Sequence, residues 1–166
     1  MIAQFQIIGQ VKKLREDKAL RELDAARKAL EKAQARTEAL TAEVEESART
    51  LPAREQAIYD VILTKIVGMS DVDDAKAQVQ RLLEDHQKLI DKRDRAREHV
   101  VRCEKLVTEA RAELVKRQGE VEKIETLTYD LIQEAAAEAV AAEEAEIEDL
   151  FARPSVGPDI EPVGVS

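Results

Sequence analysis

The residue types that most often carry chemistry are scarce in this chain and widely spaced. The two histidines, His86 and His99, lie 13 residues apart, and Cys103 is the only cysteine. A transition-metal site would need distant carboxylates to join them, and a catalytic thiol would need a base on its own helix face. The motifs GxGxxG, HExxH and GxSxG and the P-loop pattern are absent. We therefore expect no catalytic residue, no metal and no cofactor, and we interpret Cys103 as a packing residue.

Basic side chains gather near the N-terminus, in the stretch VKKLREDKALREL. Acidic residues are interleaved with them, and the stretch has no aromatic side chain on which a base could stack. The net charge of -9 also opposes binding along a nucleic acid. We interpret the run as a solvated helix face or as a contact for an acidic protein, and we expect no nucleic-acid partner.

The composition is typical of long helices and not of a globular enzyme. Charged residues make up 37% of the chain and aromatic residues 2%, with 5 glycines and 4 prolines. Such a chain has few means of building a concave pocket that excludes water. It also lacks a run of about 18 apolar residues, so we expect no membrane insertion. The single cysteine fits a reducing compartment, which predicts a cytoplasmic protein.

Hydrophobic periodicity predicts two long coiled-coil helices, one in each half of the chain. With position a at Val72, apolar residues occupy eight of 11 a positions and nine of 11 d positions in the second half of the chain. An unbroken register of this length is a strong coiled-coil signal. In the first half the same count starts from Leu23, and Val11 and Leu14 fall outside it. We therefore expect a stutter over about residues 14–23.

The chain reversal is predicted at the strongest turn signal before the prolines of the tail, Val67 to Asp71. Gly68 is expected to adopt the left-handed conformation beyond the first helix, and Ser70 is expected to cap the second. Pro52 lacks an N–H group, so we expect it to kink or break the first helix.

Two helices that reverse near residue 70 pair positions whose numbers sum to about 140. Pairing by this sum sets the a and d residues of one helix opposite those of the other. Each facing pair forms one layer of the seam, and several layers place a large side chain against a small one. We therefore expect an intramolecular hairpin and a monomer, not a parallel homodimer. Gln34 should lie near Thr108. Further predicted layers are Leu40 with Val100, Leu30 with Ala110, Ser47 with Arg93, Arg54 with His86, and Thr37 with Cys103.

The predicted fold class is all-α. A long antiparallel two-helix coiled-coil hairpin is expected over residues 1–151, with a disordered C-terminal tail over residues 152–166. The first helix is expected over about residues 3–66, the reversal over 67–71 and the second helix over about 72–151. Prolines in the stretch ARPSVGPDIEPVGVS end the second helix.

One end of this predicted hairpin combines uneven charge with apolar side chains that nothing is expected to bury. Residues 1–30 carry a net charge of +3 and residues 120–150 one of -10. Exposed apolar residues beside dense charge are typical of a docking surface, and the alternative is a frayed helical end. The candidate partner-binding residues are Ile2, Phe5, Ile7, Ile8, Lys12, Lys13, Arg15 and Phe151.

Two stretches of the chain resemble the YscO-type proteins of bacterial type III secretion systems, which are relatives of the flagellar export protein FliJ. They are VKKLREDKALREL and RCEKLVTEARAELVKRQGEVEKIETL, separated by a mid-chain interruption and followed by an acidic Glu/Ala-rich end. The similarity runs from about Val11 to Phe151. It implies a cytoplasmic stalk similar in shape to the coiled coil of the rotary ATPase gamma subunit. It also implies three partners: the hexameric export ATPase, the export-gate membrane protein and secretion chaperones.

The functional prediction is a non-enzymatic stalk or adaptor at the cytoplasmic face of the secretion apparatus, with those partners. One alternative is a generic coiled-coil scaffold or homodimeric spacer. Another is a prefoldin-like helical chaperone, but prefoldins insert β-hairpins between their helices, and VGMSDVDD is short and polar for that role. The net charge of -9 disfavours a membrane-bending helical module.

Overall fold

The structure, a computed structural model, describes residues 1–64, 68–153 and 164. Two α-helices account for nearly all of them: α1 spans Ile2–Leu63 and α2 spans Met69–Ala152. The described residues contain no strand, so the predicted all-α class is confirmed. Apart from its first two residues and Gly164, the predicted tail lies outside the described residues. Over the part of the chain that is described, neither helix has a stretch long and apolar enough to cross a membrane.

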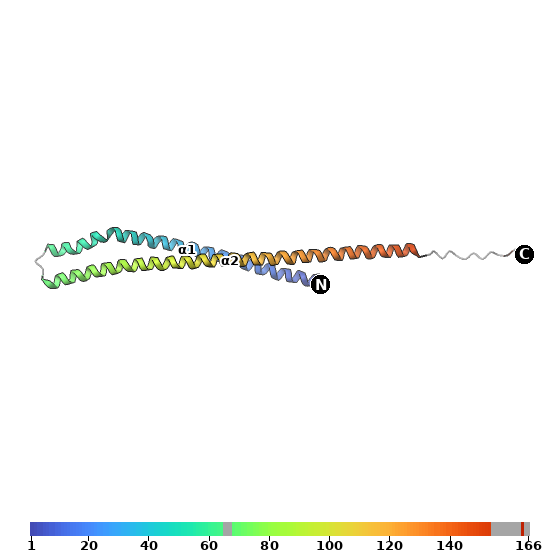
Figure 1. Cartoon of the computed structure of the whole chain (residues 1–166), viewed down its shortest axis with the longest axis horizontal. Helices are drawn as coiled ribbons and strands as arrows, with labels where there is room; N and C mark the ends of the chain where they lie inside the picture. The colour runs from blue at the N-terminus through green and yellow to red at the C-terminus, as the bar shows by residue number, and fades with distance from the viewer. Residues whose placement is uncertain (65–67, 154–163, 165–166) are drawn as a thin grey trace. The chain divides into compact units, whose positions relative to one another are not determined.

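The chain divides into two compact units. One comprises Met1–Leu14 and Gln118–Ser166, and the other comprises Arg15–Arg117. Within the Arg15–Arg117 unit, α1 and α2 run antiparallel on either side of the chain reversal and lie side by side (Figure 1). This arrangement confirms the predicted two-helix hairpin.

The core of the Arg15–Arg117 unit is a seam of small and medium-sized side chains. They lie at the predicted a and d positions, because a spacing of three and four residues returns a side chain to the same helix face at every turn. No described side chain is fully buried, since each helix is covered from one side only. The buried residues of this unit are Ala19, Leu23, Ala33, Leu40, Val44, Ser47, Ala75, Val79, Ala96, Cys103 and Val107.

The pairing of the two helices lies one heptad away from the predicted pairing. Ser47 Oγ is 2.8 Å from His86 Nδ1, so the numbers of facing residues sum to 133 and not to about 140. Ser47 therefore does not face Arg93. A shift of seven residues brings a and d positions together again, so the hydrophobic pattern fits both pairings. The helix bounds agree with the observed pairing, because Leu63 at the end of α1 and Met69 at the start of α2 sum to 132.

Other predicted layers change with this shift. By register, Leu30 shares a layer with Cys103, and Ala33 shares one with Val100. Large side chains still oppose small ones, so complementarity of size does not distinguish the two pairings either. The predicted layers that are wrong are Leu40 with Val100, Leu30 with Ala110, Arg54 with His86, and Thr37 with Cys103.

The start of α2 also differs from the prediction. The Gly68 carbonyl accepts hydrogen bonds from the N–H groups of Asp71 at 3.1 Å and Val72 at 3.4 Å, which makes Gly68 the N-cap residue. In return, the Gly68 N–H donates to Asp71 Oδ2 at 3.1 Å. A carboxylate at the third helical position that accepts from the cap is one half of a capping box, and it also suits the positive end of the helix dipole. No described glycine has a positive φ, so the predicted left-handed Gly68 and the predicted Ser70 cap are both wrong.

Pro52 lies inside α1, and the helix continues through it without a break. The proline removes one backbone hydrogen bond from the helix. Two carbonyl groups about one turn earlier gain side-chain donors: Thr50 Oγ1 donates to the Glu46 carbonyl and Arg54 donates to the Ser47 carbonyl, each at 3.0 Å. Figure 1 shows α1 bending in the teal stretch that contains Pro52, so the helix bends but does not break.

The N-terminal part of α1 pairs with α2 inside the Met1–Leu14 and Gln118–Ser166 unit. A methyl group placed on Gly9 would lie 3.8 Å from Ile124 Cγ2, which is ordinary van der Waals contact. Lys12 Nζ lies 3.3 Å from Glu120 Oε2. The residue numbers of these two pairs sum to 133 and 132, so Gly9 and Lys12 occupy the a and d positions of a continuous register.

The predicted stutter over residues 14–23 is therefore wrong. Val11 and Leu14, which suggested it, are 42% and 65% exposed and lie outside the seam. The register of Leu23 continues towards the N-terminus through Glu16 and Gly9. Because a charged residue and a glycine occupy these positions, hydrophobicity does not reveal them.

Candidate docking surface

Three of the eight predicted partner-binding residues contribute to helix pairing. Ile2, Phe5 and Lys12 are each half-buried, so the expectation that nothing in the chain covers Ile2 and Phe5 is wrong. The register explains their burial, because it sets Ile2 in the layer of Leu131 and Phe5 in that of Thr128, and both of these residues are half-buried as well.

Lys12 already has a partner within the chain. It forms a cross-helix ion pair with Glu120, and the two side chains are 27% and 25% exposed. Partial exclusion of water makes such a contact less sensitive to salt than a surface pair. Lys12 is therefore better placed to hold α1 against α2 than to contact another protein.

The exposed apolar side chains of this part of α1 form a stripe. Ile7 is 60% exposed and Ile8 is 43% exposed, as predicted for a docking surface. Val11 and Leu14 extend the stripe at the spacings i+4 and i+7 from Ile7, which places all three on one helix face. Lys13 is exposed beside them. Sequence reasoning missed Val11 and Leu14, although extending the register of Leu23 by two heptads would have identified them as exposed.

Arg15 belongs to the Arg15–Arg117 unit and does not join this stripe. It lines a shallow groove of about 390 Å³ together with Lys18, Glu22, Glu113 and Arg117. Arg117 donates to Glu113 at 2.8 Å within α2. The charges around this groove alternate in sign, so it offers no strong field for a ligand of either charge.

Phe151 is 86% exposed at the end of α2. Every residue from Ile132 to Arg153 is exposed. Phe151 is the last of a series of exposed apolar side chains near this end of α2, and the others were not identified from the sequence. Seven acidic residues and no basic residue are interspersed with this series over residues 132–152. The other members of the series are Tyr129, Ile132, Val140, Ile147 and Leu150.

The histidines and the cysteine lie in or beside the helix pairing. His86 Nδ1 faces Ser47 Oγ at 2.8 Å, and Arg54 donates to the same oxygen at 2.9 Å. His99 Nε2 lies 3.6 Å from Cys103 Sγ, and Cys103 is only 3% exposed. A thiol so covered has no access for a substrate. Over the described ranges, no group of three or more His, Cys, Asp or Glu side chains is placed to hold a metal ion.

These features define a class of protein: an antiparallel helical hairpin whose described surface carries exposed apolar and charged side chains. The family model described as "Type III secretion protein YscO" matches residues 5–153. The chain therefore belongs to the YscO family of type III secretion proteins, as the resemblance predicted. Comparison with curated proteins and with solved structures gives no match. Family membership identifies a protein associated with type III secretion.

Proposed function

We propose that this protein is a non-enzymatic stalk or adaptor that works at the cytoplasmic face of the secretion apparatus. Its proposed partners are the export ATPase ring, the export-gate membrane protein and secretion chaperones. The observation that carries the proposal is the family match over residues 5–153, which covers both helices almost completely.

The exposed residues of the Met1–Leu14 and Gln118–Ser166 unit support a docking role for it. The stripe of Ile7, Val11 and Leu14 and the neighbouring Ile8 are between 42% and 65% exposed in the described part of the chain. Lys13 adds positive charge on α1, and the acidic residues of α2 in the same unit add negative charge. Apolar contacts supply affinity at such interfaces, whereas charges supply specificity and speed of association.

The connection between the helices argues against the prefoldin-like alternative. Only five residues separate Leu63 from Met69, and Gly68 among them caps α2. A β-hairpin needs two strands of several residues each and a turn, and this connection is too short for one.

The proposal is tested by pull-down against the export ATPase and by a secretion assay in cells. We expect Ile8→Ser, Lys13→Glu and Phe151→Ser to leave helicity unchanged, because all three side chains project from exposed positions. Association and secretion should both weaken. The Lys13→Glu defect should grow smaller as salt is added, whereas the defects of Ile8→Ser and Phe151→Ser should persist.

Two controls complete the test. The exchange Lys12→Glu with Glu120→Lys preserves the internal ion pair and should retain binding. Met69→Ser alters an 80% exposed side chain at the start of α2, which is far in sequence from Ile8, Lys13 and Phe151. This variant should bind the export ATPase normally. Full binding by the three surface variants together with loss of binding by Met69→Ser would assign docking to the reversal and refute the proposal.

A further inference from the structure

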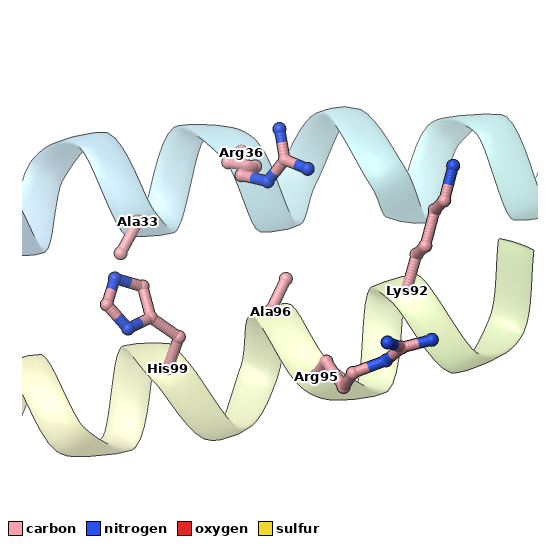
Figure 2. A pocket seen from close by; sticks show the side chains of 6 residues that line it. All are labelled: Ala33, Arg36, Lys92, Arg95, Ala96 and His99. Carbon is pink, nitrogen blue, oxygen red and sulfur yellow. The ribbon is translucent and has the colours of Figure 1, made fainter.

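A groove between α1 and α2 in the Arg15–Arg117 unit is surrounded by basic side chains. It has a volume of about 260 Å³, and its lining contains no acidic residue. Figure 2 shows Arg36 extending from α1 and Lys92, Arg95 and His99 extending from α2 around two alanine methyl groups. These methyl groups belong to Ala33 and Ala96, which form the floor of the groove and are 5% and 9% exposed.

The groove exists because of the observed helix pairing. Ala33 and Ala96 are both seam residues, and the absence of larger side chains there leaves a hollow open to solvent. His99 lies beside this seam, where its Nε2 is 3.6 Å from the buried Cys103 Sγ. With residue sums of about 140, Arg36 would lie about one heptad farther along α2. The four basic residues would then not surround one hollow.

The cations of the groove lack acidic partners. Within the described part of the chain, no carboxylate forms an ion pair with Arg36, Lys92 or Arg95, although seven other basic residues each form one. Arg95 Nε donates to the Asp91 backbone carbonyl at 3.4 Å, which leaves its charge without a counterpart. Like charges held together on a surface repel one another unless an anion joins them. A cluster of this kind in a chain of net charge -9 therefore marks a place for an anionic group.

The spacing of the cluster matches a helix. Lys92, Arg95 and His99 follow one another at intervals of three and four residues, so they repeat along one face of α2 over about 10 Å. Carboxylates at i, i+3 or i+4 and i+7 of a neighbouring helix have the same repeat. The alanine floor lets a third helix approach closely, and the Arg guanidinium groups suit bidentate binding of carboxylates. The lining contains no Phe, Tyr or Trp, the side chains that supply most stacking platforms for nucleotide bases.

We propose that this basic groove binds an acidic α-helical segment of a partner protein. The carboxylates of that segment bind Arg36, Lys92, Arg95 and His99, and its backbone lies over Ala33 and Ala96. The inference concerns a different surface from the docking residues proposed above and stands independently of the stalk proposal, because its test uses neither the export ATPase nor secretion.

The probe is a capped, labelled Ala/Glu peptide of about 20 residues, long enough to be helical, with glutamates repeating every three and four residues. Binding to the full-length protein is measured by fluorescence anisotropy, with a matched Ala/Gln peptide as comparison. We expect the glutamate peptide to bind and the glutamine peptide to bind at least about tenfold more weakly. Added salt should weaken binding of the glutamate peptide.

Variants assign the binding to the groove. Arg36→Glu with Lys92→Glu should weaken peptide binding at least about tenfold. The control, Lys76→Glu with Arg81→Glu, changes the net charge equally at two exposed residues outside the groove and should retain binding. Arg36→Gln with Lys92→Gln should give an intermediate loss, and circular dichroism should show the same helicity for all three.

Two competitor arms separate the acidic helix from other anions. Inorganic tripolyphosphate and a single-stranded oligodeoxynucleotide should weaken peptide binding no more than sodium chloride does at the same ionic strength. No binding of the glutamate peptide, or equal loss in the groove and control variants, would overturn the proposal. Groove-dependent binding of tripolyphosphate or of the oligonucleotide in preference to the peptide would overturn it as well.

Discussion

The helix α2 contains two regions that differ in burial and in the residues at their a and d positions. Up to Leu131 its a and d residues are buried or half-buried against α1, whereas from Ile132 onward every described residue of the helix is exposed. In the paired region most a and d positions hold Val, Leu, Ile, Ala or Cys. In the unpaired region they hold Ala, Glu and Asp, and the larger apolar residues move to other faces, as Ile147 does.

This difference shows that the seam between the two helices extends along α2 only as far as the residue that faces the start of α1. Ile2, the first helical residue of α1, shares its layer with Leu131, the last half-buried residue of α2. Beyond that layer no described helix pairs with α2, and its a and d positions no longer need to be large and apolar. The large apolar residues of the unpaired region therefore do not serve the helix pairing, and they are available for the proposed docking.

The largest expected effect distinguishes the two regions directly. Leu23 is 3% exposed in the paired region and Leu150 is 68% exposed in the unpaired one. Leu23→Ala should lower the free energy of unfolding by about 2–3 kcal/mol, near the low end for leucine truncation because a two-helix seam stays partly hydrated. Leu150→Ala should change it by less than about 0.5 kcal/mol. Urea denaturation followed by circular dichroism measures both, and equal effects would mean that the assigned core is wrong.

A smaller effect is expected at the polar layer of the seam. Ser47→Ala should cost about 1 kcal/mol, because it removes the hydroxyl group that bonds His86 Nδ1 and accepts from Arg54. Thr108→Ala is the matched control, since the Thr108 hydroxyl donates only to the Glu104 carbonyl of its own helix and is exposed. The same denaturation assay should show almost no change for the control. A Ser47→Ala variant as stable as the wild type would remove this layer from the account of helix pairing.

The cross-helix ion pair should have a weaker but measurable effect. Lys12→Glu should lower the free energy of unfolding by about 0.5–1 kcal/mol, because Glu120 then faces a like charge at partial burial. Adding Glu120→Lys should restore most of the loss. A double-mutant cycle measures the coupling. Absence of coupling would show that the N-terminal part of α1 does not pair with α2 as described.

The smallest effect concerns an ion pair within one helix. Arg49 hydrogen-bonds Glu46, and this contact lowers the pKa of the Glu46 carboxyl below its ordinary value. A lowered pKa in the folded state contributes stability above the ordinary pKa and loses it as the pH falls through the folded value. Because both groups are fully exposed, we expect Arg49→Ala to raise the Glu46 pKa in an NMR titration without a detectable change in unfolding. An unchanged Glu46 pKa would contradict the contact.

The sequence was sufficient to predict the helical class and the presence of a chain reversal. It also predicted the a and d faces of α2 and of α1 from Leu23 onward, because hydrophobic periodicity records them. It was not sufficient to fix the pairing, since a shift of one heptad preserves every a and d match. The observed contact between Ser47 and His86 gives the sum of 133. The pairing of the N-terminal part of α1 was missed because Gly9 and Lys12 occupy seam positions that usually hold apolar residues.

The candidate surfaces were predictable to a different extent. Ile7, Ile8, Lys13 and Phe151 are exposed as expected, and their role in docking stays a prediction. Ile2 and Phe5 could not be distinguished from them, because their cover comes from a layer that the predicted pairing misplaced. The basic groove could not be predicted at all, since Arg36 and His99 belong to one hollow only in the observed pairing.

The central claim is the antiparallel pairing within one molecule, and spin-label distances test it most directly. In a Cys103→Ser background, one pair of labels is placed at residues 34 and 97 and another at residues 34 and 108. Gln34 and Arg97 line the same groove, whereas residue 108 lies further along α2 at about 1.5 Å per residue. Because this axial offset adds in quadrature to a helix separation of about 10 Å, the first distance should be the shorter by roughly 5–10 Å. Both distances should survive dilution with unlabelled protein. A shorter distance for residues 34 and 108, or loss of the signal on dilution, would contradict the pairing.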